Sequence, residues 1–543
     1  MQSFSVNVDR KAIAQIDGYR CVNCGICEEY CPTGALKEYQ KTVCHLCPDC
    51  TEIKSMSVNQ MEELKKESCT LACPVGISPQ GYINLLKCGK IDEAYDLIWE
   101  KNPLPSVCGS ICHHPCEDVC KRGTLVDSPI KIRALKRYLS ENKLDDKVTP
   151  YPVIHQEEIA VIGGGPAGLT AAHVLAKRGY KVTVYEAAAE AGGMLLKGIP
   201  SFRLDKDIVR KEVKRLEESG IKFVFGAKVR PTDIEKDYDK IIVATGNSIS
   251  KGLPIANSVC KGVMNALDFM TKVNSGDQVT LYGNVVVIGG GSVAMDTART
   301  ALRLGADKVT VICLECGSQI PAHPWEIEET QEEGIQIISG VAPLRFEAKD
   351  NAPPHCLSNI VYTTIENLDC KTITYDPIGE EMVLSADFAI IATGQRAEPQ
   401  YITGDNIILA GDIVNDTPSV IDAMGSGHDA AIQIDKELRG REWKEYELER
   451  EMQSGDPKYR IYPAVRLKKA FPEIRKIKDR SGFDMVEQLM SDEEALLETW
   501  RCLECGYREV DIEKCIGCGV CMRVCPKGDV ITMVPVEEQG GNK

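Results

Sequence analysis

Cysteines supply the most conspicuous chemistry of this sequence, because 25 of them occur among 543 residues and most stand in short runs. The spacing C-x2-C-x2-C-x3-C-P occurs twice: at Cys21, Cys24, Cys27 and Cys31, and at Cys515, Cys518, Cys521 and Cys525. Thiolates at this spacing hold [4Fe–4S] clusters, and the cysteine before proline commonly binds a different cluster from the other three. Two such runs favour iron–sulfur ligation over a zinc site or a redox dithiol.

Other cysteine groups lie near these two runs. Three more cysteines repeat the C-x2-C-x2-C spacing: Cys44, Cys47 and Cys50. Cys31 is the expected fourth ligand of this group, which leaves the fourth ligand of the first run open, with Cys69 as one candidate. Cys502 and Cys505 can join Cys525 in a second carboxyl-terminal cluster, for which one further ligand also stays open.

A glycine-rich turn between two apolar strands predicts a dinucleotide site. Gly163 permits a tight turn, Gly165 allows close approach of a pyrophosphate, and Gly168 allows close packing of helix on strand. The helix that begins near Pro166 would point its free N–H groups at the phosphates. Glu186 ends the next strand, where a carboxylate can accept hydrogen bonds from ribose hydroxyls. A purely structural turn would leave this acid unexplained.

The same unit occurs a second time, in NVVVIGGGSVAMDTARTALRLGADKVTVICLE. Gly289 and Gly291 repeat the first two glycines, and Ala294 is small enough for the third position. Glu315 follows the second strand, where a carboxylate accepts a bond from the ribose 2′-hydroxyl and repels a 2′-phosphate. The sequence beside Glu315 contains no Lys or Arg, which favours NAD(H) over NADP(H).

The elements that would hold these residues follow from the apolar pattern. Short apolar strands, glycine-rich turns and long helices alternate at 159–186 and again at 285–315, which predicts parallel α/β sheets. Apolar residues at helical spacing predict helices at 61–67, 81–88 and 91–99.

Composition argues against several classes of function. A net charge of -16 disfavours binding to nucleic acid, which requires a large basic surface. No apolar run approaches the roughly 18 residues needed to cross a membrane, and the amino terminus lacks the apolar stretch of a secretory signal. We therefore expect a cytoplasmic protein without a membrane span, in which clustered cysteines bind metal rather than form disulfides.

Several motifs, in order, resemble a known family. They are AGGMLLKGIPSFRL, IIVATG, IIATGQ and ILAGDIVNDTPSVIDAMGSGHDAA, and the resemblance covers about residues 65–440. The sequence is similar to the glutamate synthase small (beta) subunit-like FAD/NAD(P) oxidoreductase family. That family also contains the large subunit of NADH-dependent ferredoxin:NADP oxidoreductase and the amino-terminal half of dihydropyrimidine dehydrogenase. The resemblance implies FAD at the first glycine turn and pyridine nucleotide at the second.

The resemblance also implies individual cofactor contacts. Beyond the glycines already named, they fall at Pro166, Ala167, Gly193, Thr245, Gly246, Ser292, Thr393, Gly394, Gly411 and Asp412. Asp412 is implied to lie near the ribityl-phosphate part of FAD, and Thr245 and Thr393 stand at strand ends between the domains. NADP-specific members carry an Arg pair where this chain has Leu314 and Glu315, which agrees with a preference for NADH.

Residues 69–120 resemble the helical iron–sulfur domain of the same family. The implied ligands are Cys69, Cys73, Cys112, Cys116 and Cys120. Cys108 matches a position that does not bind iron. The family's C-x-x-C pair upstream of Cys69 is missing, and Lys136, whose ammonium has no lone pair, replaces the Gln or Glu that completes a cluster in some members. We therefore expect one cluster in this domain, bound by the implied ligands without Cys69 or by a close variant of that set.

The expected fold class is α/β, with two Rossmann-like dinucleotide-binding domains and the NAD domain inserted in the FAD domain. A helical iron–sulfur domain and ferredoxin-like units at both ends complete it. In chain order, the expected parts are an amino-terminal ferredoxin-like unit (1–60), the helical iron–sulfur domain (61–150), the first part of the FAD domain (151–280), the NAD domain (281–383), the second part of the FAD domain (384–440), a charged helical linker (441–500) and a carboxyl-terminal ferredoxin-like unit (501–543).

Together these features predict an NADH-linked FAD oxidoreductase subunit of a hetero-oligomeric complex. Electrons would pass to or from a redox partner subunit or ferredoxin through about three to five [4Fe–4S] clusters, with about four as the best ligand count. Flavin-based electron bifurcation is compatible with the same parts. The alternatives are a glutamate synthase small subunit, which supplies electrons to a glutamine-dependent large subunit, and a non-catalytic cluster scaffold. The basic segment 466–480 is either a solvated connector or a docking surface for an acidic partner.

Overall fold

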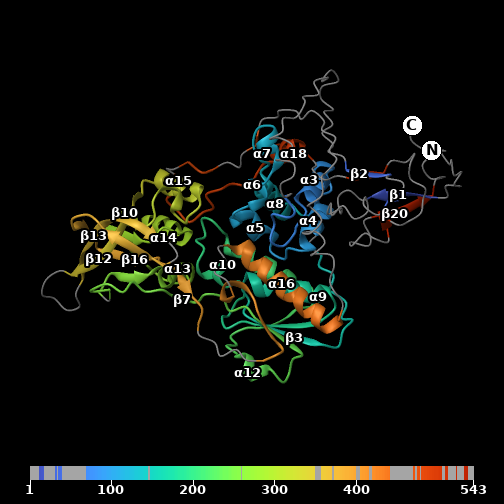
Figure 1. Ribbon diagram of the computed structural model, residues 1–543, viewed down its shortest axis with the longest axis horizontal. Helices are drawn as coiled ribbons and strands as arrows, with labels where there is room; N and C mark the ends of the chain where they lie inside the picture. Colours follow the sequence, from blue (N-terminus) through green and yellow to red (C-terminus); the bar gives the residue numbers. More distant parts are fainter. Residues whose placement is uncertain are drawn as a thin grey trace, which may run out of the picture. The chain divides into compact units, whose positions relative to one another are not determined.

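The structure is a computed structural model of the chain (Figure 1). It describes residues 12–16, 31–32, 35–38, 69–144, 147–258, 260–348, 356–369, 372–398, 404–414, 419–440, 469–470, 474–476, 479–503, 508–510, 521–522 and 531–535. The chain divides into two compact units, and each is described by itself. The first unit contains Met1–Val148, Ala431–Pro472 and Leu489–Lys543, and the second contains Thr149–Ala430 and Glu473–Gln488.

The second unit contains a five-stranded parallel sheet built around the first glycine turn. Its strands lie in the order β18 (Ile407–Leu409), β6 (Lys240–Val243), β3 (Glu158–Ile162), β4 (Lys181–Tyr185) and β5 (Lys222–Val224). Ile159, Ala160 and Val161 of β3 are fully buried, as the apolar run of a central parallel strand requires. The helices in this part of the chain are α9 (Pro166–Lys177), α10 (Met194–Lys197), α11 (Lys206–Glu218) and α12 (Pro231–Ile234), and η2 (Gly411–Ile413) and α16 (Val420–Arg439) follow the last strand.

A second five-stranded parallel sheet carries the second glycine turn. Its strands lie in the order β11 (Gln336–Ser339), β10 (Lys308–Cys313), β9 (Asn284–Ile288), β16 (Phe388–Ile391) and β8 (Val263–Asn265). The accompanying helices are α13 (Ala266–Asn274), α14 (Ser292–Arg303), η1 (Gly317–Gln319) and α15 (Pro324–Glu332). Val287 of β9 and Val311 of β10 are fully buried with Ala298 of α14, which packs this helix onto the sheet.

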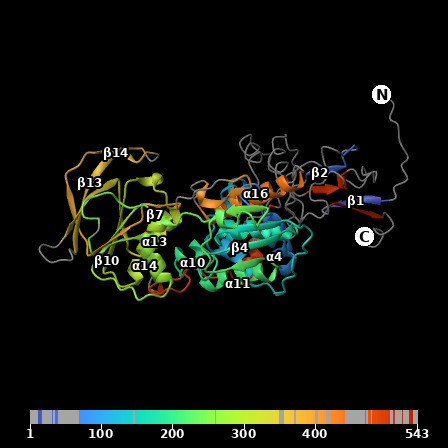
Figure 2. The same cartoon turned by 90° about the horizontal axis from the view of Figure 1, so that it is seen from below.

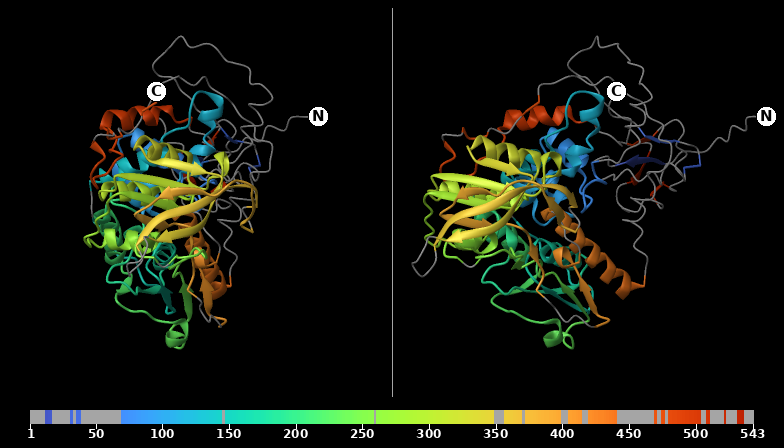
Figure 3. Two further views of the ribbon diagram at one scale, coloured as in Figure 1. Left: turned by 90° about the vertical axis from the view of Figure 1, so that its left-hand side faces the viewer. Right: turned by 60° about the vertical axis from the view of Figure 1, so that its left-hand side comes forward.

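Antiparallel strands lie along the chain between β11 and β16 of the second parallel sheet. They are β12 (Val341–Ala348), β13 (Leu357–Asp369), β14 (Thr374–Pro377) and β15 (Met382–Ser385). The long strand β13 pairs with each of the other three, and Figure 2 shows β13 beside β14. In Figure 3 these strands are the yellow and orange arrows. β7 (Ile249–Ser250) and β17 (Gln395–Arg396) also pair, so the chain enters and leaves the second nucleotide region side by side.

The two parallel sheets confirm the predicted α/β class with one nucleotide-binding fold inserted in another. Strands β8 and β16, which lie outside the expected range 281–383, both belong to the second sheet. The chain before and after the expected insertion therefore also supplies strands to the second sheet. These strands give β9 a neighbour on its second side, as the burial of a central parallel strand requires. The domain limits given above stay predictions.

The middle of the first unit is helical. Its helices are α3 (Pro79–Lys87), α4 (Ile91–Trp99), α5 (Pro105–Ile111), α6 (Pro115–Asp118), α7 (Lys121–Leu125), α8 (Ile132–Glu141) and α18 (Asp492–Arg501). The expected helix at 91–99 matches α4, the one at 81–88 corresponds to α3, and the one at 61–67 lies outside the described residues. None of the helices in the described ranges is long and apolar enough to span a membrane.

Both ends of the chain meet in the first unit, although the sequence predicts separate ferredoxin-like units there. β1 (Ala12–Ile16) pairs antiparallel with β20 (Ile531–Pro535) (Figure 1). β2 (Leu36–Glu38) pairs antiparallel with β19 (Arg508–Val510). A small core joins the two ends, formed by Ala14, Ala35, Leu36, Cys521 and Ile531. Each terminal segment alone has too few apolar residues for a core, so pairing lets the two ends share one.

A buried ionic cluster joins α7 to α18 in the first unit. Arg501, fully buried, donates to Glu498 at 2.6 Å and to Asp127 at 2.9 Å. Arg122 donates to Asp127 at 2.7 Å and to the carbonyl oxygen of Arg501 at 2.6 Å. Glu498 also accepts from the backbone N–H of Lys131 at 2.8 Å. Every group of the cluster thus has several partners, as burial of charge requires.

Glu498→Ala should lower the free energy of unfolding of the first unit by about 3–5 kcal/mol, because it leaves the buried Arg501 charge without its nearest carboxylate. Hydrogen exchange of the α18 amides in increasing urea measures this cost. Glu493→Ala changes an exposed carboxylate on the same helix and should cost less than about 1 kcal/mol. Equal costs for the two variants would contradict a stabilising role for the cluster.

Candidate functional site

The first glycine turn is built from contacts that exclude side chains. Gly163 has a φ of 108°, and a Cβ atom there would lie 2.4 Å from the carbonyl oxygen of Ala244. A Cβ atom on Gly168 would lie 2.0 Å from the carbonyl oxygen of Gly163, so α9 reaches the turn backbone to backbone. At Gly165, a Cβ atom would meet nothing within 4 Å. This open side at the start of α9 suits a pyrophosphate next to free N–H groups.

Glu186 reaches back to this turn from the end of β4. Its carboxylate accepts a hydrogen bond from the Gly164 N–H at 2.8 Å and another from the Ala188 N–H at 2.8 Å. The side chain is 7% exposed, so these two bonds fix a largely buried acid. An acid held there can still accept bonds from ribose hydroxyls, since each carboxylate oxygen has two lone pairs.

Two further segments approach the first turn. A Cβ atom on Gly193 would lie 3.0 Å from the Cα atom of Gly165, and one on Gly411 would lie 2.9 Å from the Cβ atom of Ala167. Asp412 follows Gly411 within η2. The structure therefore brings Gly193 and Gly411, which are far apart in the sequence, to the turn where the resemblance implies FAD.

Two residues of α16 support this arrangement without having been singled out in the sequence. Ser426 Oγ accepts a hydrogen bond from the Gly411 N–H at 2.8 Å. A Cβ atom on Gly427 would lie 2.0 Å from the carbonyl oxygen of Ala167, so α16 contacts the start of α9 through its backbone. The G-S-G step inside an apolar helix was the available signal, because glycine costs helix stability unless close packing requires it.

The second glycine turn repeats the construction of the first. Gly289 has a φ of 139°, and a Cβ atom there would lie 2.3 Å from the carbonyl oxygen of Ala392. Ala294 is fully buried, and a Cβ atom on Gly291 would meet nothing within 4 Å. The amino end of α14 thus presents an open side like that of α9, which suits a second pyrophosphate.

Glu315 lies beside the second turn. A Cβ atom on Gly290 would lie 2.9 Å from the Oε2 atom of Glu315, so its carboxylate occupies the place that Glu186 takes at the first turn. Burial and the charge of Glu315 raise the pKa of the nearby Cys313 thiol to about 12. Cys313 therefore stays neutral at neutral pH.

The remaining predicted contacts lie where the chain passes between the two sheets. Thr393 donates from Oγ1 to the carbonyl oxygen of Lys251 at 3.1 Å, and the Lys251 N–H donates to the carbonyl oxygen of Gly394 at 2.9 Å. Gly246, with a φ of 64°, follows Thr245 just after β6. Both crossing segments are thus tied to each other beside the β7–β17 pair.

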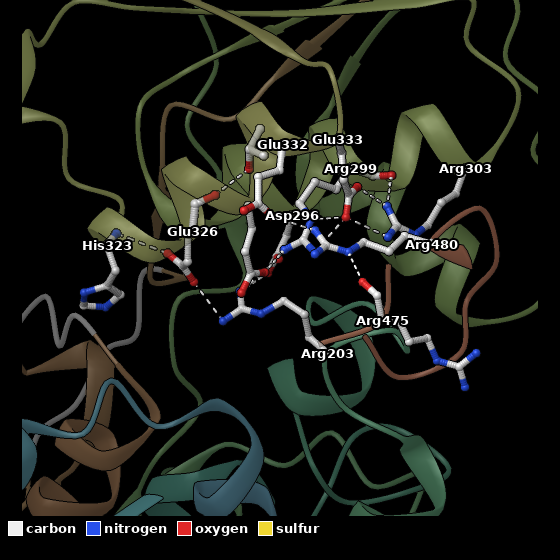
Figure 4. A network of polar contacts seen from close by, with 12 residues as sticks. Arg203, Asp296, Arg299, Arg303, His323, Glu326, Glu332, Glu333, Arg475 and Arg480 are labelled. Atoms are coloured by element: carbon white, nitrogen blue, oxygen red, sulfur yellow. Dashed lines mark hydrogen bonds and ion pairs between the residues drawn. The ribbon is translucent and has the colours of Figure 1, made fainter. Parts of the chain in front are cut away.

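Arg203 links the first nucleotide region to the second (Figure 4). It lies in the GIPSFRL motif, and its guanidinium contacts Asp296 of α14 at 2.8 Å and Glu326 of α15 at 2.8 Å. Both carboxylates are almost fully buried. Ser292, one of the predicted contacts, also hydrogen bonds to Glu326. Burial alone would raise the pKa of Glu326, but the Arg203 charge keeps it below its ordinary value.

The same network includes part of the basic segment 466–480. Arg480 donates to Glu332 at 3.0 Å and to the carbonyl oxygen of Arg475 at 2.7 Å (Figure 4). Arg475 in turn donates to the carbonyl oxygen of Met485 at 2.9 Å. These two cations are used inside the second unit, which favours the connector interpretation of the segment over a docking surface.

The first unit gathers thiols of the predicted helical cluster site. Cys73, Cys112 and Cys116 are buried, Cys120 and Cys69 are partly buried, and none of these five forms a disulfide. Cys112 and Cys116 each interact electrostatically with Cys73, and burial raises the pKa of both thiols. Among the described residues no three metal-binding side chains converge as the ligands of a single ion. Thiols that share one buried region at wider spacing suit a four-iron cluster, whose ligands surround a larger group.

The predicted ligands near the chain ends are described only in part. Cys521 is buried in the small core between the two ends, and Cys31 packs against that core. Cys502 is the carboxyl-terminal cap of α18. The other predicted ligands lie outside the described residues: Cys21, Cys24, Cys27, Cys44, Cys47, Cys50, Cys505, Cys515, Cys518 and Cys525.

Three known domain families match this sequence. The pyridine nucleotide-disulphide oxidoreductase family matches residues 157–421, and the dihydropyrimidine dehydrogenase domain II, 4Fe-4S cluster family matches 59–148. The 4Fe-4S binding domain family matches 14–37 and 508–529. FprA of Mycobacterium tuberculosis in complex with NADPH is a similar solved structure, with 18% identity, a TM-score of 0.47, and coverage of 53% of this chain and 85% of that one.

Curated relatives cover about two thirds of the chain. NAD-dependent dihydropyrimidine dehydrogenase subunit PreT of Escherichia coli is 30% identical over 68% of this chain and 91% of its own length. NADP(+)-dependent formate dehydrogenase subunit beta of Moorella thermoacetica is 31% identical over 68% of this chain, but over only 60% of its own length. Glutamate synthase [NADPH] small chain of Azospirillum brasilense is 28% identical over 67% of this chain and 84% of its own length. With two glycine turns, buried thiols and these matches, the chain belongs to the family of FAD- and NAD(P)-linked, [4Fe–4S]-containing oxidoreductase subunits that includes PreT and the glutamate synthase small chain.

Proposed function

We propose that this chain is an NADH-linked FAD oxidoreductase subunit that acts in the cytoplasm. It exchanges electrons with a redox partner subunit or ferredoxin through its [4Fe–4S] clusters. The observation that carries the proposal is the pair of glycine turns in one unit, each with an open helix start and an acid at its side. When bound, FAD accepts a hydride and releases electrons one at a time, which is the conversion that iron–sulfur clusters require.

The side chains of the second unit bind and orient rather than react. Glu186 and the open turn at Gly165 would hold the FAD ribose and pyrophosphate, and Gly291 and Glu315 would do the same for the nicotinamide nucleotide. Hydride transfer between two cofactors needs their reactive atoms in contact, so the chain contributes position and charge. Arg203, paired with buried Asp296 and Glu326, supports the relative position of the two nucleotide regions.

The choice of NADH rests on Glu315. Related proteins are named for either nucleotide, NAD for PreT and NADP for the formate dehydrogenase subunit, so kinship leaves the choice open. A carboxylate beside Gly290 accepts a hydrogen bond from the 2′-hydroxyl of NADH and repels the 2′-phosphate of NADPH.

The two ends of the chain support a single ferredoxin-like unit that holds two clusters. Strand pairing joins the ends, and Cys31 packs against the core that contains Cys521. In two-cluster ferredoxins the cysteine before proline binds the cluster of the other run. We therefore assign Cys31 to the cluster of the carboxyl-terminal run and Cys525 to that of the amino-terminal run, instead of to the Cys44 and Cys502 groups. About four clusters remain the best count for the whole chain.

A glutamate synthase small subunit is the second candidate, because that relative covers a similar share of the chain. Co-purification from the source cell separates the two functions. A glutamine-dependent large subunit as the partner would favour the second candidate, whereas a ferredoxin or a different redox subunit favours the first. If one NADH reduces a low-potential acceptor only together with a high-potential acceptor, the flavin also bifurcates electrons.

NADH should reduce the flavin at a concentration at least tenfold lower than NADPH, which corresponds to about 1.4 kcal/mol of binding preference. Glu315→Arg should narrow or reverse this preference, since a guanidinium attracts the 2′-phosphate. Stopped-flow bleaching of the flavin with each nucleotide is the measurement. Glu328→Arg makes the same charge change at an exposed position of α15 and should leave the preference intact. Equal use of both nucleotides by the unchanged protein would refute the assignment.

Ligand exchange between the chain ends predicts which cysteine variants share a spectroscopic phenotype. Cys31→Ser and Cys518→Ser should weaken the same EPR signal of the reduced protein, and Cys525→Ser and Cys24→Ser should weaken a different one. Anaerobic iron and sulfide analysis of the unchanged protein should give about 12 to 20 iron atoms per chain, as three to five clusters require. If Cys31→Ser instead matches Cys47→Ser, the ends do not exchange ligands and Cys31 serves the Cys44 group.

A further inference from the structure

Lys136 is a cation buried inside the helical domain of the first unit. It lies near the middle of α8 and is 4% exposed. A buried ammonium requires a compensating charge, because its transfer out of water costs several kcal/mol. Yet among the described residues no carboxylate forms an ion pair with Lys136. The compensation must come from other groups on the elements packed against α8.

Helix α5 is the nearest such element. A Cβ atom on Gly109 of α5 would lie 2.6 Å from the Cα atom of Arg137, so α5 and α8 touch backbone to backbone there. Arg133, one turn before Lys136, donates from its guanidinium to the carbonyl oxygen of Gly109 at 3.2 Å and of Ser110 at 2.6 Å. Residues three apart share a helix face, so Lys136 and Arg133 both belong to the side of α8 that faces the end of α5.

The end of α5 is where the predicted cluster ligands begin. Cys112 caps this helix, and Cys116 follows in α6. The charge of Lys136 interacts most strongly with the thiol of Cys108, and also with those of the predicted ligands Cys112, Cys116 and Cys73. The buried cation therefore shares this region with three of the predicted cluster ligands.

The chemistry of the site follows from these charges. A lysine ammonium has no lone pair, so Lys136 cannot bind iron in place of a Gln or Glu. A [4Fe–4S] cluster with four thiolates is anionic, and it gains one more negative charge on reduction. A fixed positive charge in a buried, low-dielectric region favours the more negative state, and the net charge around a cluster is one of the factors that set its potential.

We propose that Lys136 raises the reduction potential of the [4Fe–4S] cluster held by Cys73, Cys112, Cys116 and Cys120, as a buried counter-charge and not as a ligand. This inference rests on the proposed function, because it requires a cluster on these thiols. Lys136 thus acts on electron transfer through the cluster. Its charge sets how readily this cluster accepts an electron relative to the others in the chain.

An EPR-monitored redox titration of the full chain with its cofactors tests this role. Cys116→Ser first identifies the signal of this cluster as the one that it abolishes. Lys136→Met keeps a similar volume and removes the charge, so the midpoint of that signal should move to lower potential. We expect at least a tenfold loss in the equilibrium constant for reduction, which is 59 mV for one electron. Lys136→Arg keeps the charge and should leave the midpoint near its original value.

Controls separate this effect from others. Lys90→Met removes an exposed lysine of the same domain, where solvent screens the charge, and should not move the midpoint. Iron content and melting temperature of each variant show whether the cluster and fold survive. An unchanged midpoint in an iron-replete Lys136→Met protein, or equal shifts in the Met and Arg variants, would overturn the inference alone. If Cys116→Ser removes neither iron nor an EPR signal, the cluster assignment itself is wrong and the inference falls with it.

Discussion

Buried guanidinium groups that are paired with carboxylates fix the arrangement of elements within each unit of this protein. In the first unit, Arg501 is completely buried and is held by Glu498 and Asp127. In the second, Arg203 joins Asp296 to Glu326 from a distant part of the sequence. A buried charge that loses its partner costs several kcal/mol, whereas a paired one contributes little net stability. Such pairs therefore act mainly by selecting one arrangement of the elements. A chain that misplaces α18 or the GIPSFRL loop would leave buried charges without partners.

Close backbone approach is the second constraint, and it shapes both glycine turns. At both glycine turns the first glycine touches the carbonyl of a neighbouring strand end, Ala244 in one case and Ala392 in the other. The next glycine of each motif, Gly165 or Gly291, faces open space. The same residue type thus serves tight packing at one position and free access at the next. Free access to N–H groups at a helix start, with an acid beside it, is what an adenine dinucleotide requires.

Most of what could be predicted from the sequence came from local motifs. Two strand–turn–helix units, their acids at Glu186 and Glu315, and helix α4 follow from short-range patterns, and the structure contains each of them. Contacts between distant segments could not be predicted in this way. The pairing of β1 with β20, the bond from Gly411 to Ser426 and the Arg203 pairs join residues that belong to different elements, from 15 to several hundred positions apart, and no local pattern encodes them. Lys136 stood out only as a poor ligand, because its surroundings depend on how α5 meets α8.

The charged stretch 441–500 does more than connect the parts on either side of it, because its described residues contribute to both units. Glu473–Gln488 belongs to the second unit, where Arg480 pairs with Glu332 of α15. Beyond it, α18 completes the ionic cluster of the first unit, and β19 and β20 pair with the amino-terminal strands. The segment that begins at Glu473 therefore completes the fold of the second unit and then that of the first unit. Because each unit lacks buried partners without it, the folding of both units depends on the same stretch of polypeptide. A chain with glycine turns in one unit and clustered thiols in the other thereby builds both units from one polypeptide, and neither unit is complete without the carboxyl-terminal segment.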